Sequence, residues 1–199
     1  MKTITLLFLS FITLSFTGAA PLFKASVIVN KQNIAIIPDA IIKLNGAKNF
    51  ELQFKMPKQK ESMVRIYASR DNVVYNQFKS GVSIDNIEIF KGYNTFAVSV
   101  KEYTKLDQDF YVSNSGVRAF VHESSTFTSF TKVDSTQQEY TFTHPVKEIF
   151  YIDHDKDIRK NYSLGNFEAD TIYCILTASS TGTAMDTTFA PIPFKMVLK

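Results

Sequence analysis

The feature that most constrains this chain is an alternation of apolar and polar side chains in several short segments. In segment 50–56, Phe, Leu, Phe and Met alternate with Glu, Gln and Lys. Segments 96–101 and 194–199 have the same period of two. Because successive side chains of a strand point to opposite faces, this period predicts sheets with one buried face and one face in water.

Other segments rich in Ile, Val, Phe, Tyr and Thr predict further strands. They are 25–29, 40–44, 63–69, 73–78, 85–90, 117–122, 126–131, 139–143, 146–152 and 171–178. No sustained apolar stripe at helical spacing accompanies them. Strands that recur about every 8–12 residues without intervening helices indicate an all-β protein, an antiparallel β-sandwich.

A polar segment at 101–116 divides the chain near its middle. Each half then has about 90 residues, the size of an immunoglobulin-like sandwich. We therefore expect two tandem immunoglobulin-like sandwiches, at 20–106 and 107–199. One larger sandwich built from both halves is the alternative.

The first residues have the pattern of a secretory signal peptide. Lys2 precedes the apolar run Ile4–Phe16, which is shorter than the ~20 residues that a membrane-spanning helix needs. Thr17 and Ala19 fit the small positions before a cleavage site, so we expect residues 1–19 to be removed. The sequence then predicts an exported protein of the periplasm, the cell surface or the extracellular medium.

Composition narrows the class of protein. Hydrophobic residues make up 45% of the 199 residues and the net charge is +3, which indicates a globular chain without a strongly basic surface. We expect no nucleic-acid partner, and no later apolar run is long enough for an integral membrane protein with a spanning helix. Cys174 is the single cysteine, so it cannot form a disulfide within the chain, and its apolar surroundings predict an inert core thiol.

One short acidic segment suggests a metal site. Asp153, Asp155 and Asp157 occupy alternate positions, and alternate carboxylates can direct oxygens to one hard cation. They are our candidate calcium ligands, although the alternative is a charged turn after the strand 146–152. Asn161 opens an Asn-Tyr-Ser sequon, a glycosylation site only if the source is a eukaryote.

Catalytic and cofactor motifs are missing from the sequence. The histidines, His122, His144 and His154, lack the short spacing of zinc ligands, and no Gly-x-Ser-x-Gly or glycine-rich phosphate loop occurs. We therefore predict no catalytic residue and no cofactor, with calcium left open. A hydrolase remains the alternative if His122 and His154 converge with Asp153 and Asp155 in one cleft.

These observations favour an exported, non-enzymatic β-sandwich protein that is a binding or structural component of an envelope or extracellular assembly. We expect a protein partner or a saccharide. The alternatives are a β-sandwich hydrolase with a carboxylate and histidine cleft, and a calcium- or saccharide-binding module. Two prolines, Pro191 and Pro193, precede the last alternating segment, which we expect to be an edge strand.

Overall fold

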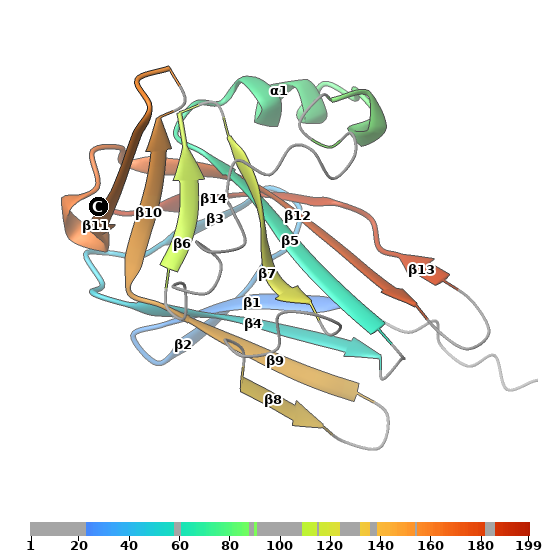
Figure 1. Cartoon of the computed structure of the whole chain (residues 1–199). Coiled ribbons are helices and arrows are strands. Elements are labelled where there is room, and N and C mark those ends of the chain that lie inside the picture. Colours follow the sequence, from blue (N-terminus) through green and yellow to red (C-terminus); the bar gives the residue numbers. More distant parts are fainter. Residues whose placement is uncertain are drawn as a thin grey trace, which may run out of the picture.

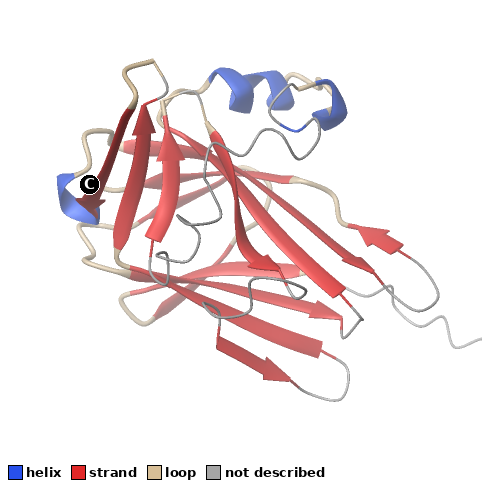
Figure 2. Cartoon of the chain, in the orientation of Figure 1, coloured by secondary structure: helices blue, strands red, loops and turns tan. Residues whose placement is uncertain are grey.

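The structure of the chain is a computed structural model. It describes residues 23–57, 61–87, 90, 109–114, 116–123, 132–135, 139–153, 155–181 and 186–199. Within these ranges the protein is mostly β, with one short α-helix (Figure 1 and Figure 2). The expected signal peptide at 1–19 and the expected strands at 96–101 and 126–131 lie outside the described residues.

The smaller sheet has five described strands, all antiparallel, in the order β2-β1-β4-β9-β8. Their bounds are β1 Lys24–Val29, β2 Gln32–Ala35, β4 Phe50–Pro57, β8 Lys132–Ser135 and β9 Glu139–Val146. The inward side chains of β4 are those of the predicted alternation. Phe50, Leu52, Phe54 and Met56 are each at most 2% exposed, so the alternation in this segment is confirmed.

The larger sheet has nine described strands, and seven of them follow the order β11-β10-β6-β5-β12-β14-β3. In addition, β7 pairs with β5 and β13 pairs with β12. The bounds are β3 Ala40–Lys43, β5 Glu61–Ser69, β6 Asp109–Ser113, β7 Val117–Glu123, β10 Glu148–Asp153, β11 Ile158–Ser163, β12 Thr171–Thr181, β13 Asp186–Thr188 and β14 Ile192–Val197. One hydrophobic cluster takes residues from both sheets, and Cys174 lies in it fully buried. Burial raises the pKa of the Cys174 thiol, and the predicted place of this cysteine in the core is confirmed.

The larger sheet is mixed, so the expectation of a purely antiparallel architecture is wrong for this sheet. The strand pairs β6–β10 and β3–β14 are parallel. The strands β5 and β6 are also parallel where they pair, at Ser69 and Ser113. Alternation specifies that a segment is a strand but carries no information on the direction of its neighbour.

Strands from both halves of the chain share both sheets. In the smaller sheet β4 pairs with β9, and in the larger one β5 pairs with β12. The domain boundary that we expected between residues 106 and 107 therefore does not separate one sheet from the other, because each sheet contains strands from both sides of this boundary. The sequence pattern could not reveal this, because each strand presents the same alternation whichever partner it meets.

The segment 73–78 was expected to be a strand, and this expectation is wrong. It forms the helix α1 (Val73–Lys79), which Figure 1 shows over the end of the larger sheet. Tyr75 is buried against Tyr67 and Ile175 of that sheet, and Val74 and Phe78 pack beside it. The positions 74, 75 and 78 fit a helical period, whereas the β-branched pair at 73 and 74 had favoured a strand. Likewise, the first two residues of the expected strand 85–90 belong to the short 3-10 turn η1 (Ile84–Asn86).

The last strand is not at an edge. β14 lies between β12 and β3, which corrects the expectation drawn from its prolines. Pro193 is tolerated because the ladder with β3 begins only at Phe194. Pro145 lies inside β9 opposite Glu51 of β4, two residues beyond Thr143, where the described pairing with β8 ends. No helix in the described part of the chain is long and apolar enough to cross a membrane.

Candidate functional site

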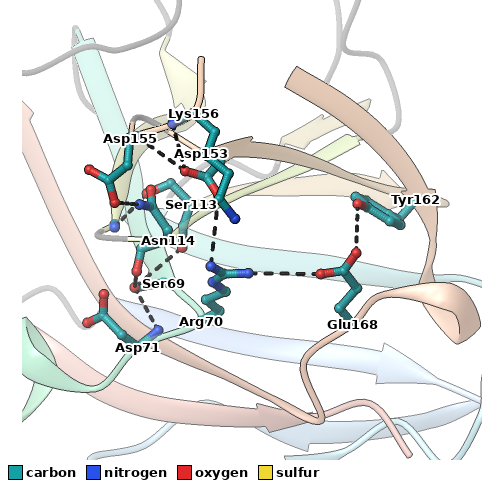
Figure 3. A network of polar contacts seen from close by, with 11 residues as sticks. Ser69, Arg70, Asp71, Ser113, Asn114, Asp153, Asp155, Lys156, Tyr162 and Glu168 are labelled. Atoms are coloured by element: carbon teal, nitrogen blue, oxygen red, sulfur yellow. Dashed lines mark hydrogen bonds and ion pairs between the residues drawn. The ribbon is translucent and has the colours of Figure 1, made fainter. Parts of the chain in front are cut away.

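Three neighbouring strands of the larger sheet run in the same direction, so their carboxyl ends lie together at one end of the sheet. Their last residues are Ser69 of β5, Ser113 of β6 and Asp153 of β10, and all three are buried polar residues. Figure 3 shows the polar contacts that gather there. We call this group of contacts the carboxyl-edge network. It comprises Ser69, Arg70, Asp71, Ser113, Asn114, Asp153, Asp155, Lys156, Tyr162 and Glu168.

Backbone and hydroxyl contacts hold the strand ends together. The Ser69 hydroxyl donates to the Asn114 carbonyl at 3.2 Å and accepts from the Asp71 backbone N–H at 3.0 Å. The backbone N–H of Arg70 donates to the Ser113 carbonyl at 3.0 Å. Because buried polar groups without partners are costly, these contacts stabilise the turns at this edge.

Charged side chains cross between the same loops. The Arg70 guanidinium lies 3.9 Å from a carboxylate oxygen of Asp153 and 3.9 Å from one of Glu168. The Lys156 ammonium lies 3.8 Å from the same Asp153 oxygen, and the Tyr162 hydroxyl donates to Glu168 at 3.2 Å. Asp153 is almost fully buried, and the two cations replace part of the hydration that its carboxylate loses on burial.

Beneath Arg70 lies the ring of Tyr151, 5.1 Å from the guanidinium carbon. This cation–π contact belongs to the buried part of the site. Burial raises the pKa of Tyr151 to about 12, although the Arg70 charge acts in the opposite direction. The Tyr151 hydroxyl is buried without a hydrogen-bond partner among the described residues.

The predicted calcium ligands lie at the end of β10 (Asp153) and in the turn that joins β10 to β11 (Asp155 and Asp157). Asp153 Oδ1 accepts from the backbone N–H groups of Asp155 and Lys156 at 3.2 Å each, and Asp155 accepts from the Asn114 amide at 2.7 Å. Asp157 is exposed and has a φ of 50°, a left-handed conformation that Asp adopts in turns. These contacts are those of the charged turn that was our alternative.

A metal ion at the turn remains a prediction. In the described ranges no group of three or more His, Cys, Asp and Glu side chains lies close enough to hold one. Two of the three candidates already accept hydrogen bonds from N–H groups of the chain. A cation would have to replace these donors before it could use the same oxygens.

The histidines do not meet at this edge as far as the structure describes them. The β5–β7 register puts His122 opposite Val64, five residues from Ser69, or about 17 Å along the strand. His144 is buried in β9 opposite Leu52, and His154 lies outside the described residues. The register therefore gives no support to a hydrolase cleft that includes His122.

Sequence reasoning missed much of the carboxyl-edge network. Arg70, Asn114 and Tyr162 stand alone in separate segments, and no local pattern links them. Glu168 was considered only as a further metal ligand that could reach the acidic turn from elsewhere; in the structure it contacts Arg70 and Tyr162 instead. Asn161, the predicted glycosylation residue, is exposed on β11, where its side-chain amide donates to Glu148 at 2.7 Å. Only the parallel pairing of β5, β6 and β10 reveals which polar residues share one edge.

Comparison of the chain with protein-family models, with curated proteins and with solved structures gives no match. The fold by itself defines a mostly β protein with one antiparallel and one mixed sheet, which share a hydrophobic cluster. The functional argument rests on the contacts and surfaces of this chain.

Proposed function

We propose that this chain is an exported, non-enzymatic protein that binds a partner within an envelope or extracellular assembly. The observation that carries the proposal is the position of β11 at the end of the larger sheet. β11 pairs with β10 on one side and with no other described strand, and five of its six residues are exposed. A strand edge of this kind can accept an extended segment of another protein by β-strand addition.

The carboxyl-edge network supports this use of β11 because it braces the β10–β11 hairpin. Asp153 and Asp155 anchor the turn, and the Tyr162 hydroxyl ties β11 to Glu168. Because these contacts already fix the conformation of β11, this strand loses less conformational entropy when a partner docks. Arg159 and Lys160 give β11 a basic character, so an acidic extended segment is the partner that its charge favours.

The state of the carboxylates supports binding over catalysis. Asp153, Asp155 and Glu168 each contact N–H, hydroxyl or cationic groups of the chain itself. A general base must direct a lone pair at its substrate, and the buried carboxylate, Asp153, directs its oxygens at N–H groups and cations of the chain. The export part of the proposal depends on the segment 1–19 and predicts a native protein that begins at Ala20.

The experiment is site-specific photo-cross-linking in the native host. A photoreactive amino acid replaces Lys160 on β11, and the matched control replaces Gln77, an exposed residue of α1. We expect one stoichiometric adduct from position 160, none from position 77, and an acidic segment in the cross-linked peptide. Equal labelling at both positions, or none at position 160, would overturn binding at β11. N-terminal sequencing of the same protein tests export separately.

A further inference from the structure

A second surface of the molecule shares no residue with the carboxyl-edge network. It is a groove of about 420 Å³ along the β1–β2 hairpin, bordered by β4 and by the first residue of β14. Its volume falls within the range of about 300–1,000 Å³ typical of small-molecule sites. We call it the hairpin groove.

One part of the hairpin groove is apolar. Its lining includes Phe23, Ile36, Ile37, Pro38 and Ile192. Ile37 is 59% exposed, one of the largest exposures of a big apolar side chain in the described chain. An apolar ligand that covers Ile37 would remove this surface from water, which is favourable in proportion to the area covered.

The other part of the groove carries two lysines that face each other. Lys24 and Lys55 are directly opposite in the β1–β4 register, and both are exposed. Residues directly opposite in an antiparallel pair have Cβ atoms about 4.5–5.5 Å apart, and like charges in that position repel each other. The described lining contains no carboxylate that could neutralise them, while Ser26 and Gln53, the next pair along the strands, offer hydrogen-bonding groups.

This combination defines the ligand by its chemistry. An apolar body fits the wall that contains Ile37, and a single anionic head relieves the repulsion between Lys24 and Lys55. We propose that the hairpin groove binds a free medium-chain fatty acid, with its carboxylate between the two lysines. The proposal is independent of strand addition at β11, because the two sites share no residue.

The size of the groove sets the chain length of the probe. A methylene group takes a volume comparable to the roughly 30 Å³ of a water molecule in the liquid, so a ten-carbon chain needs about 300 Å³. Decanoate is therefore the probe. Decyltrimethylammonium has the same chain length and the opposite charge, so the pair of probes separates the role of the lysines from that of the apolar wall.

The test is isothermal titration of the chain 20–199 with each probe below its micelle concentration. The variants are the double substitution Lys24→Gln with Lys55→Gln, the apolar-wall substitution Ile37→Ser, and the control Lys43→Gln, an exposed lysine of β3 outside the groove. All four positions are exposed, so the variants should fold, and a thermal melt of each checks this.

We expect saturable one-to-one binding of decanoate, and binding of the cationic probe at least about tenfold weaker. The lysine double variant should lose about tenfold in decanoate affinity, equivalent to the loss of one charge-assisted contact. Ile37→Ser should weaken both probes, and Lys43→Gln should change neither. Equal binding of the two probes, unchanged decanoate affinity in the double variant, or no saturable binding would each overturn the proposal.

Discussion

Gly116 shows how one residue position can decide the packing of this protein. It precedes β7 with a φ of 106°, a conformation that side-chain-bearing residues rarely adopt. A Cβ built there would lie 1.9 Å from Cε2 of Tyr67, whose side chain is fully buried and cannot retreat. Both backbone strain and a steric clash therefore demand glycine at position 116.

We expect Gly116→Ala to lower the free energy of unfolding by about 2–4 kcal/mol. Gly46→Ala is the matched control, because Gly46 also has a positive φ of 69° but has no atom within 4 Å of its built Cβ. The control should cost only about 1 kcal/mol, the strain of the backbone alone. Urea unfolding of both variants measures the difference, and equal losses would contradict the clash with Tyr67.

Tyr151 gives a prediction about pH at the same scale. Its pKa is raised to about 12 by burial, from the ordinary value of about 10. The folded state therefore prefers the protonated phenol. The stability that this preference contributes is fully present below pH 10 and is lost as the pH rises through about 12.

We expect Tyr151→Phe to be as stable as the parent at pH 7, or more stable by about 1 kcal/mol, because the buried hydroxyl has no partner in the described structure. Between pH 9 and pH 11 the variant should lose less stability than the parent. Urea unfolding at pH 7, 9 and 11 gives both comparisons. A clear loss of stability at pH 7 would mean that the hydroxyl does form a hydrogen bond.

At the scale of elements, α1 shows where local composition and tertiary packing disagree. Val73 and Val74 favour a strand, yet the segment is helical because Tyr75 and its neighbours cover Tyr67 and Ile175 on the outer face of the larger sheet. The same cover contributes to the burial of Tyr67 in β5, on a face that alternation would leave exposed. The helix and the buried outer side chain of this strand are thus linked by packing.

Val73 offers a test of this helix because its side chain is 58% exposed. Alanine has a higher helix propensity than valine and a lower strand propensity. We expect Val73→Ala to stabilise the protein by about 0.5 kcal/mol, measured by thermal or urea unfolding. A loss of similar size would instead favour the strand that the local sequence suggests.

At the scale of the whole molecule, the shared sheets predict a single cooperative unit. β4 and β5 come from the first half of the chain and pair along most of their lengths with β9 and β12 from the second half. A fragment of either half would expose the inner faces of its strands and leave their edges unpaired.

We expect the fragments 20–106 and 107–199 to lack stable structure alone, while the chain 20–199 unfolds in one transition. Circular dichroism and the dispersion of amide proton signals in NMR spectra of the fragments provide the measurement. If either fragment folds by itself, or if the whole chain unfolds in two separate transitions, the halves are independent domains, as the polar segment 101–116 suggests.

Much of the fold at the level of strands could be predicted from local pattern. The alternation in 50–56 and the β-rich segments 63–69 and 171–178 correspond to β4, β5 and β12. Cys174 was also placed correctly in the core. The candidate site was predicted only in part, because Asp153 and Asp155 form a visible local cluster whereas Arg70 and Glu168 do not.

The sequence by itself determined that this chain forms sheets, which side chains face the core, and where the acidic turn follows its strand. Those properties depend on residues that are close in sequence, and the alternation of apolar and polar side chains reflects them. Only the tertiary structure decided that β3, β6 and β10 have parallel neighbours, that 73–79 is a helix, and that Lys24 meets Lys55. These features depend on contacts between segments that are distant in sequence. The local pattern of a segment does not specify which other segment it contacts.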